Sequence, residues 1–190
     1  RGARPRRQQA VALAAERPVA VARPAKVYGP GDRGFVPLYR LKTRGLLPAF
    51  GPTGQRFSIV YVDDLVEGLV LALDAASSRR QGGTFHFAGP EDFVWEDFAL
   101  AFGQALGRRV LVLRPPSWAI FSAAVFNTLG ARLGLPSSLL TLDKWREVFA
   151  GDWLLDCART RELLGWEARQ ALPQGAKATL GWCRERRLLP

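Results

Sequence analysis

Short apolar runs recur along the chain and are bounded by Gly, Pro and charged residues. Runs of a few residues rich in Val, Ile, Phe and Tyr are typical of buried strands. The run FSIVYV is the clearest of them. The sequence therefore predicts four strands, at Pro18–Ala22, Phe57–Val62, Thr84–Ala88 and Val110–Leu113.

Between and after these runs, apolar residues recur three and four positions apart, which is the spacing of one helix face. The helices predicted from this spacing cover Gln8–Glu16, Phe35–Arg44, Asp63 or Asp64 to Leu73, Trp95–Leu106, Trp118–Leu133, Leu142–Phe149, Arg159–Leu164 and Gln174–Arg187. Gly45, Gly107 and Gly165 each follow one of them, as C-terminal capping glycines do. In the third helix, Asp64 and Glu67 have the spacing of a capping box, and Leu65, Leu69 and Leu73 share one face.

Alternation of strands with helices favours an α/β fold with a mostly parallel sheet. After about residue 114 the pattern becomes mainly helical. We therefore expect residues 1–113 to hold the strands of a sheet domain and residues 114–190 to form a mainly helical lobe. No methionine occurs, even at position 1, which favours a fragment of a longer protein.

The net charge of +10 raises the question of a polyanionic partner. Only four of the 27 basic residues are lysines, and the arginines are scattered, with one dense cluster at Arg1, Arg4, Arg6 and Arg7. This distribution indicates compositional bias and does not favour nucleic acid. Cys157 and Cys183 stand far apart and fit neither a disulfide framework nor a zinc site, so we expect a reducing cytoplasm.

One segment, Ser117–Leu135, is apolar enough to raise a membrane interpretation. Its apolar core, Trp118–Phe126, is too short to span a bilayer. We therefore expect a packed helix and no membrane span. Contact with an apolar substrate or a membrane surface stays open as an alternative.

The stretch Gly29-Pro-Gly-Asp-Arg-Gly34 has the letters of a dinucleotide-binding loop. Such a loop needs free backbone N–H groups aimed at phosphates, whereas Pro30 has no N–H and Asp32 adds a negative charge. We interpret the stretch as a Gly/Pro turn. His86, within an apolar strand, is interpreted as a core or surface histidine.

Several ordered motifs together resemble one family. They are Arg23-Pro-Ala-Lys-Val-Tyr-Gly-Pro-Gly-Asp32, Gly51-Pro-Thr-Gly54, Ile59-Val-Tyr-Val-Asp-Asp-Leu65, the segment from Asp156 through Arg161-Glu-Leu-Leu-Gly-Trp166, and Gly175 with Thr179 and Trp182. In this order they resemble the C-terminal half of the NAD(P)-dependent epimerase/dehydratase family, the extended short-chain dehydrogenases. The resemblance implies the closing part of a Rossmann-type parallel sheet with a helical substrate-binding lobe, NAD or NADP as cofactor, a small-molecule substrate and, at full length, a homodimer.

The resemblance also implies roles for residues of the first motif. Pro24 would lie near the nicotinamide, and Lys26 and Tyr28 would face the substrate, although Tyr28 is equally well interpreted as a packed turn aromatic. Asp63 and Asp64 are expected to cap a helix. The family's catalytic Tyr and Lys stand four residues apart, but Tyr28, Tyr39 and Tyr61 are followed four places on by Asp, Thr and Leu.

If the register holds, Arg1 and Pro5 occupy the two catalytic positions, so no catalytic residue is assigned to this chain. It would be a truncated enzyme or a degenerate remnant that is inactive alone and in which tight binding of the dinucleotide is not expected. The alternative class is a non-catalytic binding module that uses its basic N-terminus on nucleic acid.

The substrate class follows from departures at positions where family members acting on nucleotide sugars carry polar or cationic residues. Lys26, Phe57 and Phe149 stand there, and Arg56 lies one place away from a family arginine. Loss of cations that pair with a diphosphate favours a less charged substrate. The chain is thus interpreted as part of an oxidoreductase or epimerase acting on a carbonyl compound or a nucleotide sugar, with a ketone, sterol or polyketide-like carbonyl preferred.

Overall fold

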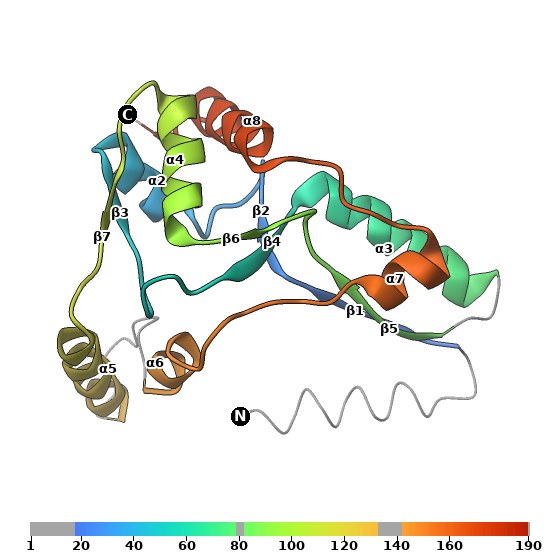
Figure 1. Ribbon diagram of the computed structural model, residues 1–190, viewed down its shortest axis with the longest axis horizontal. Helices are drawn as coiled ribbons and strands as arrows, with labels where there is room; N and C mark the ends of the chain where they lie inside the picture. Colours follow the sequence, from blue (N-terminus) through green and yellow to red (C-terminus); the bar gives the residue numbers. More distant parts are fainter. Residues whose placement is uncertain (1–17, 79–81, 133–141, 190) are drawn as a thin grey trace.

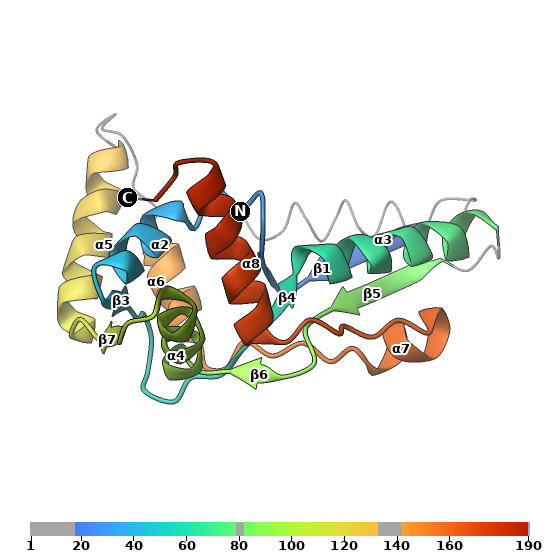
Figure 2. The ribbon, with the colours of Figure 1, turned by 90° about the horizontal axis from the view of Figure 1, so that it is seen from above.

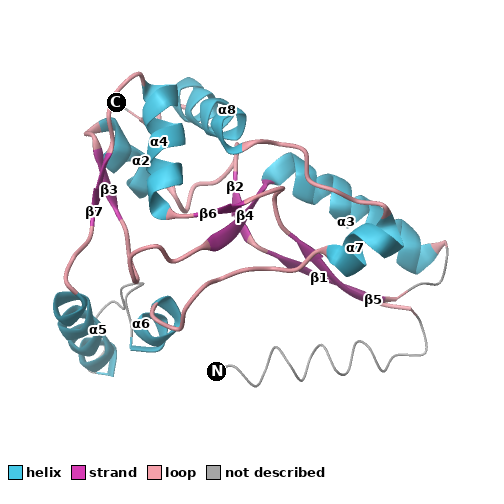
Figure 3. Cartoon of the chain, viewed as in Figure 1, coloured by secondary structure: helices cyan, strands magenta, loops and turns pink. Residues whose placement is uncertain are grey.

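The computed structural model describes residues 18–78, 82–132 and 142–189 (Figure 1). In these residues, short and mainly parallel strand pairs are covered by helices, which confirms the predicted α/β class (Figure 3). The predicted helix Gln8–Glu16 and the basic cluster Arg1–Arg7 lie outside the described residues.

Three parallel strand pairs run through the described chain. β1 (Ala20–Pro24) pairs with β5 (Gly83–Phe87), β2 (Lys26–Tyr28) with β4 (Phe57–Tyr61), and β3 (Leu46–Pro48) with β7 (Leu111–Leu113). β6 (Asp92–Phe93) pairs antiparallel with β4. All five residues of β4 are buried, as expected for a central strand without polar/apolar alternation.

The described helices are α2 (Val36–Thr43), α3 (Val62–Ser77), α4 (Trp95–Leu106), α5 (Ser117–Arg132), α6 (Leu142–Val148), α7 (Ala158–Leu164) and α8 (Leu172–Glu185). They alternate with strands as far as α5, and α6, α7 and α8 then follow one another. α4 ends at Gly107 and α7 at Gly165, each in the left-handed conformation that the sequence predicted for a capping glycine. At the start of α4, the Asp97 carboxylate accepts a hydrogen bond from the Val94 N–H at 3.0 Å.

Two apolar clusters form the core. One lies among α2, α4, α8 and β4 and is built on stacked rings, with Tyr39 and Phe102 5.3 Å apart and Phe98 and Phe102 4.6 Å apart. The other joins α3, β5 and the segment after α7 around Phe87 and Trp166, whose rings meet edge to face at 5.0 Å. Figure 2 shows these two groups of elements at opposite ends of the molecule, joined through β4. α8 packs on α4, and α7 on β5.

The structure corrects several details of the sequence interpretation. β2, β3 and β6 lie in stretches for which the sequence predicted no strand. α3 begins at Val62 without a side-chain cap, so the predicted capping box of Asp64 and Glu67 is wrong. Leu65, Leu69 and Leu73 lie in α3 at the predicted helical spacing, but only Leu65 is buried, whereas Leu69 and Leu73 are exposed.

Asp64 accepts long-range hydrogen bonds from the segment before α8. Its carboxylate accepts hydrogen bonds from the backbone N–H groups of Arg169 and Gln170, at 3.2 and 2.9 Å, and its carbonyl accepts one from the Trp166 indole at 2.9 Å. These bonds fasten the segment before α8 to the first turn of α3. Asp63 and Asp64 lie in the first turn of α3, but no side-chain capping bond forms there, and the hydrogen bonds of Asp64 are tertiary.

Neither cysteine forms a disulfide, and burial raises the pKa of both thiols. No helix in the described part of the chain combines the length and the apolar character needed to cross a bilayer.

Candidate substrate site

The candidate site lies where β2 and β4 run side by side. Their register pairs Lys26 with Ile59 and Tyr28 with Tyr61, so the two strands end together. Ligands of open parallel α/β sheets bind beyond the carboxyl ends of the strands. The turn Gly29–Asp32 leaves β2 at this edge, and α3 begins at the same edge after β4.

Two cavities flank β2. The smaller one, about 30 Å³, is lined by Lys26, Val27, Tyr28, Phe35, Phe57, Ile59, Trp95 and Phe98. The larger one, about 360 Å³, lies between the turn and Val62 and is lined by Val27, Tyr28, Gly29, Pro30, Gly31 and Asp32. Only the larger cavity falls within the usual size range of small-molecule pockets, and Val27 and Tyr28 line both.

The Lys26 ammonium is held in an aromatic cage. Its Nζ lies 3.6 Å from the ring centroid of Trp153, 4.9 Å from that of Phe57 and 5.7 Å from that of Trp95. A cation is attracted to the negatively charged face of each ring within about 6 Å. The cage therefore orients the lysine and covers one side of it with apolar surface.

The chain after α6 supplies Trp153. It runs beside β4, where the Trp153 N–H donates to the Arg56 carbonyl at 2.8 Å and the Ser58 N–H donates to the Trp153 carbonyl at 2.9 Å. Next to it, Arg56 and Asp152 form an ion pair at 3.0 Å. Hydrogen bonds from the Arg56 backbone and guanidinium lower the pKa of the Asp152 carboxyl. The guanidinium is thus engaged in holding the segment that carries Trp153.

Tyr28 is buried beneath α8. Its ring meets Tyr61 edge to face at 5.5 Å and Phe98 at 6.4 Å. Burial, followed by the charges of Tyr61 and Asp64, raises the pKa of Tyr28 above its ordinary value. The phenol accordingly stays protonated near neutral pH and does not act as a phenolate base there.

The Gly29–Gly34 stretch forms a turn that leads into α2. Gly29 and Gly31 have φ of +140° and +91°, and a Cβ at Gly29 would lie 2.6 Å from the Val62 side chain. Asp32 accepts a hydrogen bond from the Phe35 N–H at 3.2 Å and one from the Tyr39 hydroxyl at 3.4 Å. The carboxylate thus stabilises the helix start, in agreement with the turn interpretation.

Of the residues assigned to the site, the structure brings Lys26, Tyr28 and Phe57 to one cavity. Arg56 and Phe149 are not among the residues that line it: Arg56 pairs with Asp152, and Phe149 packs against Trp145 at 5.1 Å in α6. Pro24 is exposed at the end of β1.

Among residues without an assigned role, Trp95 and Trp153 complete the cage around Lys26. No sequence pattern marks them, because their positions depend on how α4 and the chain after α6 pack beside β4. His86 is partly buried, and its Nδ1 lies 3.1 Å from the Asp156 carbonyl oxygen. In the described residues, no group of three His, Cys, Asp or Glu side chains gathers as a metal site would require.

With this fold and site described, the chain is similar to Rossmann-type epimerases and reductases. Residues 6–88 match the model of the NAD dependent epimerase/dehydratase family. The chain is 26% identical over 185 residues to the ceramide reductase of Caulobacter vibrioides, covering 93% of this chain and 55% of the relative. It is 28% identical over 176 residues to the UDP-glucose 4-epimerase of Vibrio cholerae, covering 90% and 49%.

Solved structures agree. The UDP-glucose-4-epimerase of Stenotrophomonas maltophila, with bound NAD and formylated UDP-arabinopyranose, superposes with a TM-score of 0.66 at 17% identity, over 97% of this chain and 53% of that one. The UDP-glucuronic acid 4-epimerase of Bacillus cereus, with UDP-glucuronic acid and NAD, gives 0.61 at 20% identity, over 89% and 46%. These matches confirm the family resemblance found in the motifs. The chain spans about half the length of the curated relatives that it matches.

Proposed function

We propose that this chain supplies the substrate-binding half of an NAD(P)-dependent oxidoreductase that acts on a weakly charged carbonyl compound. The family match and the parallel strands support the class. The two curated relatives, a ceramide reductase and a UDP-glucose 4-epimerase, represent the two substrate classes and are nearly equal in identity, so the choice depends on the site.

The observation that carries the choice is the state of two cations. The Lys26 ammonium is packed against Trp153, Phe57 and Trp95, and the Arg56 guanidinium is bonded to Asp152. A diphosphate is recognised by cations that direct several N–H donors at its oxygens. A lysine covered by rings, in a site lined mainly by aromatic and aliphatic side chains, suits an uncharged carbonyl better.

In this proposal Lys26 and Tyr28 contact the substrate and Phe57 forms an apolar wall. Phe149 extends the apolar surface in the α6 region, and Arg56 acts by positioning Trp153. Pro24 lies beside the nicotinamide. Bound NAD(P) would supply the hydride acceptor or donor.

Among the described residues, Pro24 is the one that we assign to the nicotinamide end of the cofactor. Pro24 is exposed and near the Lys26 cavity in sequence, but the Gly29–Gly34 turn does not fit a pyrophosphate, because Pro30 lacks an N–H and the Asp32 carboxylate is engaged in starting α2. We therefore expect no appreciable affinity of this chain alone for NAD or NADP. Calorimetric titration with a dissociation constant below about 10 μM would contradict this expectation.

The substrate test compares kcat/KM for a long-chain ketone and for a UDP-sugar in the protein that joins this chain to a nucleotide-binding half. The variants are Phe57→Arg, which adds a cation, and Asp152→Asn, which releases Arg56. Each is expected to lower the ratio of ketone to UDP-sugar activity by about tenfold, the size of one charge-assisted hydrogen bond.

A matched control is Glu167→Gln, which breaks the exposed Arg161–Glu167 pair outside this site. The control should leave the ratio unchanged. A UDP-sugar preference in the unmodified protein, or a ratio that neither site variant alters, would refute the proposed substrate class. Tight binding of the chain to nucleic acid that weakens by decades with salt would instead favour the non-catalytic alternative.

A further inference from the structure

Large apolar side chains are exposed along one edge of the molecule. The exposed fractions are 51% for Leu111 and 46% for Leu113 in β7, and 71% for Trp118 and 75% for Phe126 in α5. Figure 1 shows β7 and α5 following one another along this edge. We call these four residues the β7–α5 edge. Apolar patches of this kind mark interaction surfaces more often than single exposed residues do.

Two large aromatic side chains of α5, Trp118 and Phe126, are exposed to solvent. Ile120 and Ala124 are buried, whereas Trp118 and Phe126 are exposed. Trp118 and Phe126 are eight residues apart, which places them about 80° from one another around a helix of 3.6 residues per turn. No charged residue occurs between Ser117 and Ala131. The part of α5 from Ser117 to Thr128 therefore presents an uncharged outer face.

Two hydroxyl groups of α5 are satisfied inside the helix. Ser122 Oγ donates to the Trp118 carbonyl at 2.8 Å, and Thr128 Oγ1 donates to the Ala124 carbonyl at 2.7 Å. Such bonds to the carbonyl four residues back remove the need for water at these hydroxyls. This matters because a polar group without a partner is costly to transfer from water into a lipid environment.

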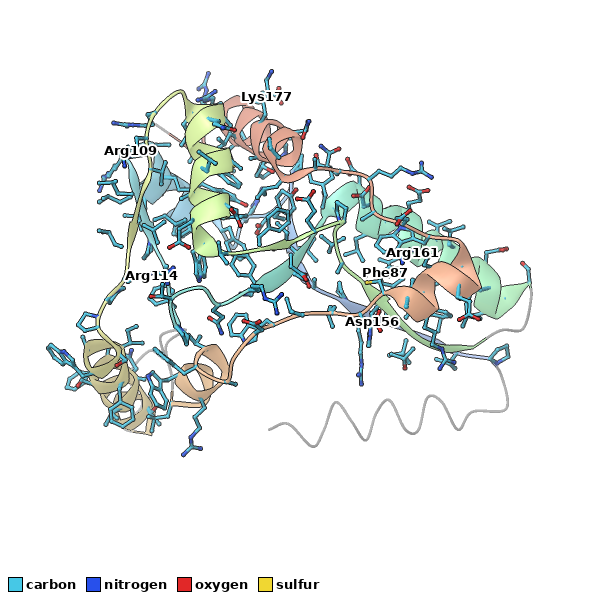
Figure 4. All side chains as sticks on the ribbon, viewed as in Figure 1. Phe87, Arg109, Arg114, Asp156, Arg161 and Lys177 are labelled. Carbon is cyan, nitrogen blue, oxygen red and sulfur yellow. The ribbon has the colours of Figure 1, made fainter. Side chains whose placement is uncertain are left out.

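Cationic side chains lie at the start of the same edge. Arg108 and Arg109 precede β7 and are exposed, and Arg44 is exposed beside them, because the Leu111 N–H donates to the Gly45 carbonyl at 2.8 Å. Figure 4 shows Arg109 at one end of β7 and Arg114 at the other. Arg114 pairs with Glu96 at 2.6 Å. The other three arginines give the apolar edge a positive flank.

We propose that the β7–α5 edge docks this protein onto the surface of an anionic phospholipid bilayer. Trp and Phe side chains would enter the interfacial region, and Arg44, Arg108 and Arg109 would contact lipid phosphates. Charge complementarity favours a bilayer with anionic headgroups, because the three cations lie beside an apolar face of α5 that carries no charge from Ser117 to Thr128. The surface excludes the residues that line the Lys26 cavity, so this proposal can fail or hold independently of the proposed enzymatic function.

The test is flotation of the chain with vesicles of phosphatidylcholine alone and of phosphatidylcholine with about one third phosphatidylglycerol. We expect the wild type to float with anionic vesicles and far less with neutral ones, and to dissociate as salt rises. Trp118→Ser with Phe126→Ser should reduce the partition coefficient by at least about tenfold. Arg108→Glu with Arg109→Glu should remove the preference for anionic vesicles.

The matched control is Val70→Ser with Leu73→Ser, because these α3 side chains are similarly exposed, at 61% and 67%. This control should bind like the wild type. Quenching of wild-type tryptophan fluorescence by brominated lipids, lost in Trp118→Phe, gives a second measurement that does not depend on the stability of the double variants. Unchanged flotation of the Trp118/Phe126 variant would overturn the proposal. The proposal would also fall if these substitutions abolished self-association in sedimentation equilibrium and left vesicle binding unchanged.

Discussion

Lys42 provides the sharpest test of the packing, because the lysine is fully buried in α2 and its Nζ has no hydrogen-bond partner among the described residues. The Nζ lies 3.5 Å from the ring centroid of Phe102, 3.8 Å from that of Phe98 and 5.0 Å from that of Tyr39. Two opposing effects act on it. Loss of hydration disfavours the ammonium, and the three ring faces favour it.

We expect the loss of hydration to be the larger effect. An unsatisfied buried donor costs about 1–3 kcal/mol, and more when the group is charged. A desolvated cation–π contact returns about 2 kcal/mol, but only while the amine is protonated. Burial lowers the pKa of Lys42 well below its ordinary value, so the attraction to the rings weakens where the amine loses its proton. Lys42→Met, which keeps the chain length, should therefore raise the free energy of unfolding by about 1–3 kcal/mol near pH 7.

The pH dependence has a definite sign. Because the pKa of Lys42 is lower in the folded protein, the unfolded chain binds more protons between the folded and unfolded pKa values. The stability of the wild type should therefore rise with pH through this window, up to the unfolded pKa of about 10.4. Lys42→Met lacks this contribution, and the two proteins should become more alike as the pH approaches 10.

The measurement is denaturant-induced unfolding of wild type and Lys42→Met at several pH values. Lys177→Met is the matched control, since Lys177 is exposed on α8 (Figure 4), and it should change stability by less than about 0.5 kcal/mol. A Lys42→Met protein that is less stable than the wild type near pH 7, with the same pH slope, would refute the reasoning. It would mean that the rings hold a charged lysine.

Two further predictions concern α8 and α3. Gly175→Ala should lose about 1–3 kcal/mol of stability, because the added Cβ would overlap the Tyr28 hydroxyl and lie 2.8 Å from its ring. Gly181→Ala in the same helix meets nothing within 4 Å and should gain up to about 1 kcal/mol, so equal thermal shifts in the two variants would contradict this packing. Asp64→Ala should lower the free energy of unfolding by about 1–3 kcal/mol, because the variant loses two hydrogen bonds from backbone N–H groups. Asp63→Ala, at an exposed position, should differ little from the wild type. Unfolding curves in which Asp63→Ala is the less stable of the two variants would exclude the tertiary role of Asp64.

Local patterns in the sequence predicted much of the fold. Trp95–Leu106 with Gly107, and the helix before Gly165, have the predicted C-terminal ends, because a glycine in the left-handed conformation ends a helix by a purely local rule. The strand at Phe57 was predicted with a difference of one residue at its end, because a run of β-branched and aromatic residues is itself the signal. The order of the motifs was sufficient to indicate the family that the chain resembles.

Short strands escaped prediction for a physical reason. β2, β3 and β6 have two or three residues each, too few to show a period, and they exist through partners far along the chain. Lys26 pairs with Ile59, and Leu46 with Leu111. Nothing within a three-residue stretch specifies such a partner.

The site divides in the same way. The sequence by itself determined the α/β alternation, the helix ends and the identity of Lys26, Tyr28 and Phe57 as candidates, since each depends on local propensity or on a motif. Only the tertiary structure decided that Trp95 and Trp153 enclose the Lys26 ammonium, that Arg56 is paired with Asp152, and that Asp64 binds the chain before α8. These contacts join residues from about 70 to more than 120 positions apart, so they depend on how whole elements pack.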